Sequence, residues 1–153
     1  MCDYSLHGIE NRLAEEGEVL VVHRFYTGSK GLTSPEYLER TEKRTQQPNG
    51  WRAILASKLA APASGCAVCI PDGAKLMLRG ISPLLRQAHG LSTTEAVTFR
   101  QLSANAATYR DAIEFKNGVK VCLQDLEAGQ SIEVLALSAE IRIVLPSTSF
   151  PSP

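Results

Sequence analysis

The stretch AIEFKNGVKVCL, residues 112–123, decides the fold prediction because it has the pattern of a β-hairpin. A two-residue Asn-Gly loop would place Phe115 opposite Lys120, which mixes apolar and charged positions on one face. A three-residue loop that ends in a left-handed Gly118 instead pairs Phe115 with Val119. We predict the second register because it gathers the apolar side chains on one face: Ile113, Phe115, Val119, Val121 and Leu123.

Outward from this hairpin, the second half of the chain reads as short strands separated by turns. One short helix interrupts them, because Ser82-Pro83 combines a capping side chain with a first-turn proline and Gly90 is a stop signal. The expected strands cover residues 74–81, 95–102, 131–137 and 141–145.

The first residues also read as a hairpin, with segments 4–13 and 18–26 on either side of a turn at 14–17. Matching the apolar and charged rows of the two segments pairs odd positions with odd positions. His7 and His23 are both odd, so we expect them to share one face of this hairpin.

Two helices are expected between this hairpin and the middle of the chain. Ser34-Pro35 is a helix start signal, and the first helix is predicted over residues 35–46. The second, over 51–60, has apolar residues at helical spacing that favour packing on the sheet: Trp51, Ile54, Leu55 and Leu59.

These elements predict a mainly-β fold, a β-rich α+β domain. We expect a compact, partly open barrel or sandwich of about seven or eight short strands with two or three short helices. The predicted domain covers residues 1–146, and a flexible Ser/Pro-rich tail covers 147–153.

Charge and hydropathy exclude some classes of partner. The 153 residues include 16 basic and 16 acidic side chains, and no basic stripe of the kind that binds nucleic acid is present. No apolar run approaches the about 20 residues of a membrane-spanning helix, and no basic amphipathic segment suggests a membrane surface. The start lacks the pattern of a secretory signal, so we expect a cytoplasmic protein.

The clearest chemical motif is SGCAVCIPDG, residues 64–73, where Cys66 and Cys69 are separated by two residues. A redox dithiol needs the first cysteine at a helix start, and Pro71 disfavours a helix here. We expect a turn that leads into the next strand and directs both sulfurs into one cavity. Two interpretations remain: the cysteines are buried packing residues, or they are half of a metal site.

A structural zinc or iron site requires two more ligands. The shared face of the predicted hairpin suggests His7 and His23 as the second pair. Cys2 is the first substitute because the N-terminal segment can fold over the site, and Cys122 is the second. Cys122 is expected to point away from the apolar face of its own hairpin.

Cys2 suggests a second kind of chemistry. Removal of Met1 would leave a cysteine whose own α-amine can act as its base. The start resembles that of amidotransferases with an N-terminal cysteine nucleophile, which begin Met-Cys-Gly, although Asp3 stands here in place of the glycine.

These observations lead to two functional hypotheses. The first is a small non-catalytic binding or assembly module, with a protein partner or self-association and with a Cys/His metal site at the C-x-x-C turn. The alternative is an enzyme that uses Cys2 as nucleophile or a metal-activated water.

Overall fold

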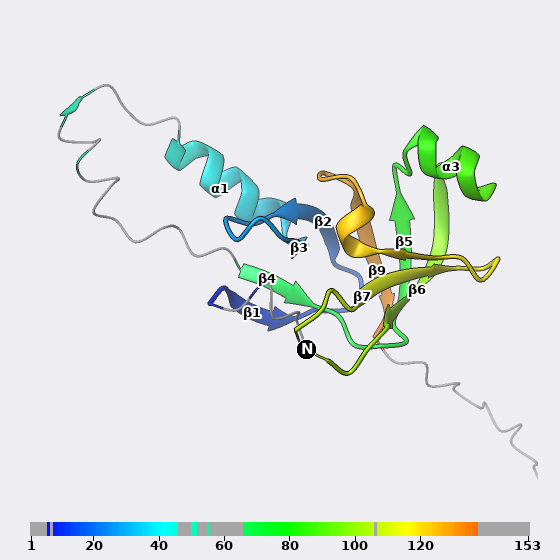
Figure 1. Ribbon diagram of the computed structural model, residues 1–153. Helices are drawn as coiled ribbons and strands as arrows, with labels where there is room; N and C mark the ends of the chain where they lie inside the picture. Colours follow the sequence, from blue (N-terminus) through cyan, green and yellow to red (C-terminus); the bar gives the residue numbers. More distant parts are fainter. Residues whose placement is uncertain are drawn as a thin grey trace, which may run out of the picture.

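The computed structural model describes residues 6, 8–45, 50–51, 55, 66–105 and 107–137. Its main feature is a seven-stranded antiparallel sheet in the order β3-β2-β9-β5-β6-β7-β8, which curls into a half-barrel (Figure 1). A second, two-stranded sheet pairs β1 with β4. The strands are β1 (Glu10–Leu13), β2 (Val19–Arg24), β3 (Lys30–Thr33), β4 (Cys66–Cys69), β5 (Lys75–Arg79), β6 (Thr94–Gln101), β7 (Asp111–Phe115), β8 (Lys120–Cys122) and β9 (Ser131–Ala136).

The expected β-rich fold is confirmed, and its core follows from period-two alternation along the strands. In β5, Leu76 and Leu78 are fully buried, while Lys75 and Arg79 are exposed. The same alternation in the neighbouring strands directs an apolar row into the half-barrel. Its fully buried members include Leu20, Leu76, Leu78, Ile113, Ile132 and Val134.

The hairpin β7–β8 has the predicted register. Ile113 lies opposite Val121, the Phe115 amide donates to the Val119 carbonyl, and Gly118 has a left-handed φ of 84°. The short helix α3 (Pro83–His89) is also as predicted. The Ser82 hydroxyl caps its start, and left-handed Gly90 ends it.

The sheet curls far enough for its two edge strands to be joined by one short helical turn. The 3-10 helix η2 (Leu123–Asp125) follows edge strand β8 and contacts edge strand β3. The Gln124 side chain accepts a hydrogen bond from the Lys30 amide and donates one to the Lys30 carbonyl, at 2.8 and 2.7 Å. On the side of β3 away from β2, the Gln124 side chain therefore makes the backbone hydrogen bonds to Lys30 that a neighbouring strand would make.

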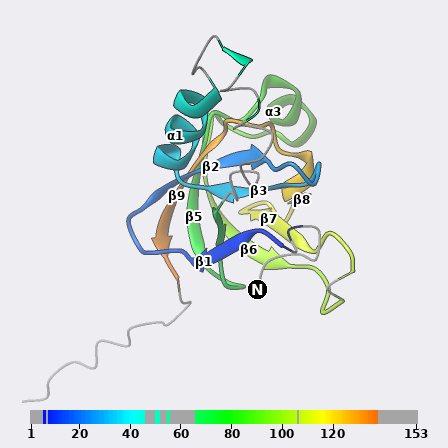
Figure 2. The ribbon, with the colours of Figure 1, turned by 90° about the vertical axis from the view of Figure 1, so that its left-hand side faces the viewer.

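The predicted N-terminal hairpin is wrong. β1 pairs with β4 in parallel, with Glu10 opposite Cys66, and β2 pairs with β3 and β9. The buried face of β2 carries the even residues Leu20 and Val22, not the odd ones. Figure 2 shows β1 on the outside of the molecule, where all four of its residues are exposed.

The charged side chains of Arg12 and Glu18 suggested that segments 4–13 and 18–26 pair as strands. In the structure these two side chains do contact each other, but the strands that carry them do not pair. Arg12 forms an ion pair with Glu18 at 2.8 Å, which joins the end of β1 to the residue before β2 without strand pairing. The tight turn 25–29 joins β2 to β3, a strand that the sequence did not suggest.

Helix α1 (Pro35–Thr45) forms where it is predicted and lies beside β2 (Figure 1). Of the second expected helix, only Trp51 and Leu55 are described; both are helical, with exposed fractions of 68% and 50%. The expected packing of this helix on the sheet depends mainly on residues outside the described part. The expected strand at 141–145 and the tail at 147–153 lie outside the described residues.

Candidate functional site

The C-x-x-C motif forms strand β4 rather than the expected turn. Side chains alternate along a strand, so Cys66 and Cys69, three positions apart, point to opposite faces of the small sheet. Both faces are largely covered: Ala67 and Cys69 on one face and Val68 on the other have exposed fractions of 0%, 6% and 5%, whereas Cys66 is half-buried. The turn follows at residues 71–74, after the second cysteine, because Gly73 is left-handed there.

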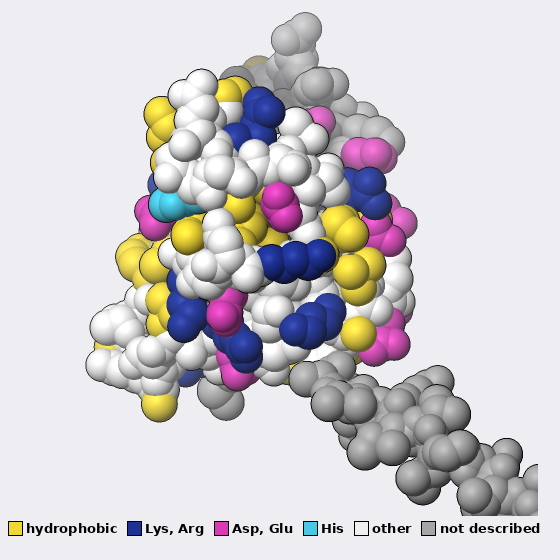
Figure 3. All heavy atoms as spheres, turned by 90° about the vertical axis from the view of Figure 1, so that its right-hand side faces the viewer, with side chains coloured by type: hydrophobic (Ala, Val, Ile, Leu, Met, Phe, Trp, Pro, Cys, Tyr) yellow, Lys and Arg dark blue, Asp and Glu magenta, His cyan; other side chains and the backbone are white. Residues whose placement is uncertain are grey.

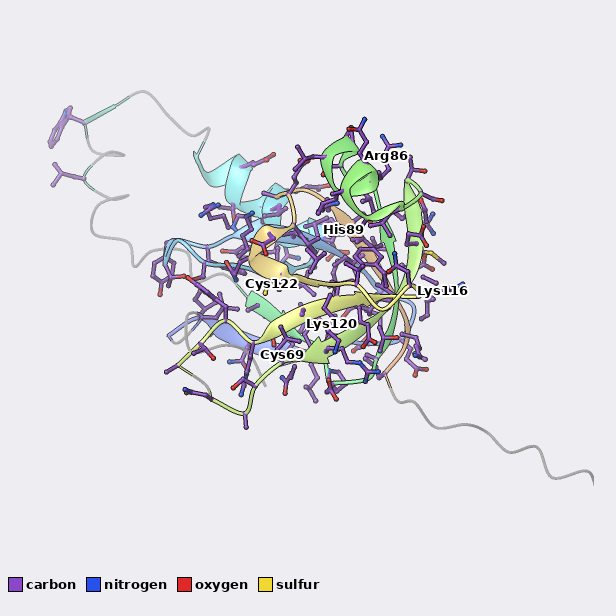
Figure 4. The ribbon with its side chains drawn as sticks, turned by 45° about the vertical axis from the view of Figure 1, so that its right-hand side comes forward. Cys69, Arg86, His89, Lys116, Lys120 and Cys122 are labelled. Atoms are coloured by element: carbon purple, nitrogen blue, oxygen red, sulfur yellow. The ribbon has the colours of Figure 1, made fainter. Side chains whose placement is uncertain are left out.

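The cysteines also differ in chemical state. Cys69 is disulfide-bonded, whereas Cys66 and Cys122 are thiols. A sulfur in a disulfide is not a thiolate, so Cys69 could ligate zinc or iron only in its reduced state. Figure 4 shows Cys69 and Cys122 on different strands, β4 and β8.

His23 lies on β2 with its ring edge against Phe25, and the two ring centroids are 4.9 Å apart. Burial lowers the pKa of His23 below its usual value, because the charged form loses hydration. Burial therefore favours the neutral ring, which packs against Phe25 as an aromatic side chain.

The predicted metal ligands are not brought together in the described part of the chain. Among residues 6, 8–45, 50–51, 55, 66–105 and 107–137, no three His, Cys, Asp or Glu side chains form a group that could hold a metal ion. His7 and Cys2 lie outside the described residues, so the complete ligand set, His7 and Cys2 included, stays a prediction.

A small internal cavity lies beside Cys69, between the small sheet and the half-barrel. Its volume is about 10 Å³, and Cys69 and the buried Asp111 are its polar lining. Apolar side chains make up the rest of the wall: Leu6, Leu32, Val68, Ile70, Phe99 and Leu123. This space is at the lower limit for one water molecule and holds no organic ligand.

A larger hollow of about 420 Å³ opens at the surface between Arg79-Gly80 and residues 127–131. Two of its polar side chains, those of Gln130 and Arg79, are already paired. The Gln130 side chain accepts from the Glu127 amide and donates to the Gly80 carbonyl, and Arg79 forms an ion pair with Glu133. The hollow therefore offers few groups to a ligand.

The solvent-facing side of the large sheet, here called the outer face, has an apolar centre. Val19 and Leu135 have exposed fractions of 45% and 44%. Cross-strand pairing places Glu133 opposite both Val19 and Met77, and Met77 opposite Ala96. Exposed apolar side chains on neighbouring strands favour contact with another protein surface.

Beside this centre lies a cationic cluster, defined as Lys75, Arg100 and Lys120 around Glu114. Lys120 is directly opposite Glu114, and Thr98 lies between Glu114 and Lys75. Arg100 pairs with Glu114 at 2.5 Å, and the Lys75 amine donates to the Thr98 hydroxyl at 2.8 Å. Figure 3 shows Lys and Arg side chains gathered on the side of the molecule that carries β5 and β6.

All three cations favour the charged form of one carboxylate, that of Glu114. The hydrogen bond from Arg100 holds the pKa of Glu114 below its usual range, and the charges of Lys120 and Lys75 lower it further. Among the described residues, no carboxylate lies within ion-pair distance of Lys75 or Lys120. Three positive charges and one negative charge give these four residues a net charge of +2, in a chain whose total charge is zero. The Asp72 carboxylate, outside the cluster, also acts on Arg100.

Sequence reasoning missed this cluster. The predicted hairpin register already placed Glu114 opposite Lys120, which was the available signal. The positions of Lys75 and Arg100 depend on the register between β5, β6 and β7, which no local pattern fixes.

No protein-family model, curated protein or solved structure matches the chain. Within the described ranges, no helix is long and apolar enough to cross a membrane.

Proposed function

We propose that the chain is a non-catalytic binding module that contacts a protein partner through the outer face of its large sheet. The observation that carries the proposal is the exposed apolar centre at Val19 and Leu135, beside half-buried Met77. Protein interfaces combine such an apolar centre with a charged rim. Here the cationic cluster supplies the charged rim, and the ion pair Arg79–Glu133 crosses the centre itself, since Glu133 lies between Val19 and Met77.

The test begins with affinity capture from cells that make the protein, identification of the bound protein, and reconstitution from purified components. The variant Val19→Glu/Leu135→Glu should abolish the reconstituted complex, because it places two charges in the apolar centre. Leu84→Glu is the matched control, since Leu84 is 79% exposed but lies on α3. A complex that survives the double substitution would contradict the proposal. Sedimentation of the chain alone decides whether the partner is a second copy.

The alternative hypothesis, an enzyme with Cys2 as its nucleophile, is tested by comparing N-terminal variants with the parent chain. Extending the N-terminus, or replacing Cys2 with alanine, would remove an N-terminal nucleophile but would leave the outer face intact. Under the binding proposal, both variants form the reconstituted complex as the parent chain does. Loss of a cellular activity in the Cys2→Ala variant, with the complex unchanged, would favour the enzyme.

A further inference from the structure

The cationic cluster is held in place by the sheet and not by flexible loops. Its side chains come from β5, β6 and β8, and Glu114 at its centre comes from β7. Neighbouring strands are spaced by about 4.8 Å, so Lys75 and Lys120 are about 14 Å apart at the backbone. The one carboxylate between them is already paired with Arg100 at 2.5 Å.

We propose that the cationic cluster is the docking site for an acidic, extended segment of a protein partner. This inference rests on the proposed function and names the chemistry of the partner. An extended chain advances about 3.3 Å per residue, so about five residues span the distance from Lys75 to Lys120. Alternate residues face the sheet, so carboxylates at every second position meet the cations.

Two features favour an acidic protein over a nucleic acid. The cluster adjoins the apolar centre, because Met77-Ala96 is the row next to Lys75-Thr98 in the same pair of strands. A partner with both apolar and acidic side chains therefore covers both regions at once. In addition, the chain as a whole has 16 basic and 16 acidic residues, without the basic excess that the phosphate backbone favours.

The test uses the full chain and a fluorescein-labelled poly-glutamate peptide, with binding followed by anisotropy. Lys75→Gln/Lys120→Gln should weaken binding about five- to tenfold, the sum of two exposed ion pairs. Arg24→Gln/Arg40→Gln is the matched control, because it removes the same charge from exposed positions on β2 and α1 and should leave binding within about twofold.

The variant Glu114→Gln should change peptide affinity in the opposite direction to the lysine variant. Removing the one carboxylate of the cluster raises its net charge from +2 to +3, so this variant should bind the peptide several-fold more tightly. A folding defect would not do this. Weaker or unchanged binding by Glu114→Gln, or equal losses in the lysine variant and its control, would overturn the inference.

A further experiment distinguishes an acidic protein segment from a nucleic acid as the ligand of the cationic cluster. Labelled oligothymidylate that binds as tightly as poly-glutamate, through the same two lysines, would overturn the acidic-protein inference. The proposed function fails independently, through the response of the reconstituted complex to Val19→Glu/Leu135→Glu. If that complex depends on the apolar centre while poly-glutamate does not bind, the inference about acidic segments falls and the binding module stands.

Discussion

At the scale of single residues, the Gln124 side chain links η2 to edge strand β3 by hydrogen bonds to the backbone of Lys30. Its side chain satisfies both backbone groups of Lys30, and the Lys30 amine donates to the carbonyls of Gln124 and Leu126 at 2.8 and 2.5 Å. Gln124→Ala leaves the partly buried amide and carbonyl of Lys30 without these partners. We expect a loss of about 1–3 kcal/mol in the free energy of unfolding, measured in urea. Gln87→Ala, on the exposed side of α3, is the control and should change stability little.

His23 makes a pH-dependent contribution. Its pKa in the folded state is lowered by burial, so the unfolded chain binds a proton more readily. The stability contribution is present above the unfolded value of about 6.5 and is lost as the pH falls through it toward the folded pKa.

The matching experiment compares urea midpoints at about pH 7.5 and about pH 5.5. The His23→Gln variant should show a smaller fall in stability on acidification than the parent chain. Equal pH dependence in His23→Gln and the parent would show that the His23 ring is not the source.

At the scale of elements, the β7–β8 hairpin isolates the cost of a backbone conformation. Gly118 has φ of 84°, and a Cβ added there meets no atom within 4 Å. Gly118→Ala therefore introduces conformational strain without a clash, and we expect a loss of about 1–2 kcal/mol in unfolding free energy. Gly118→Asn should lose less, because asparagine tolerates this conformation better. An alanine variant as stable as the parent would contradict the three-residue loop.

The elements that the sequence predicted are those that local chemistry determines. The hairpin register follows from one glycine and five apolar side chains, and α3 follows from Ser82, Pro83 and Gly90. The parallel pairing of β1 with β4 joins residues more than fifty positions apart, and no local pattern encodes it. The side-chain alternation of segment 4–13 fits several pairing partners equally well.

The same limit explains the candidate site. The spacing of Cys66 and Cys69 suits a turn as well as a strand, and the choice depends on the distant β1. Of the four sheet positions in the cationic cluster, only Glu114 and Lys120 belong to one local hairpin. The other two join them through the pairing of β5 with β6 and of β6 with β7.

At the scale of the whole molecule, stability should fall from the centre of the large sheet to the small sheet. β5 and β9 each have a strand on both sides and carry fully buried Leu76, Leu78, Ile132 and Val134. β1 has one partner, and all four of its residues are exposed. Native-state hydrogen exchange should therefore give β5 and β9 the slowest amides, which open only on global unfolding, and β1 the fastest among the described strands. Protection of β1 equal to that of β5 would mean that the small sheet unfolds together with the half-barrel.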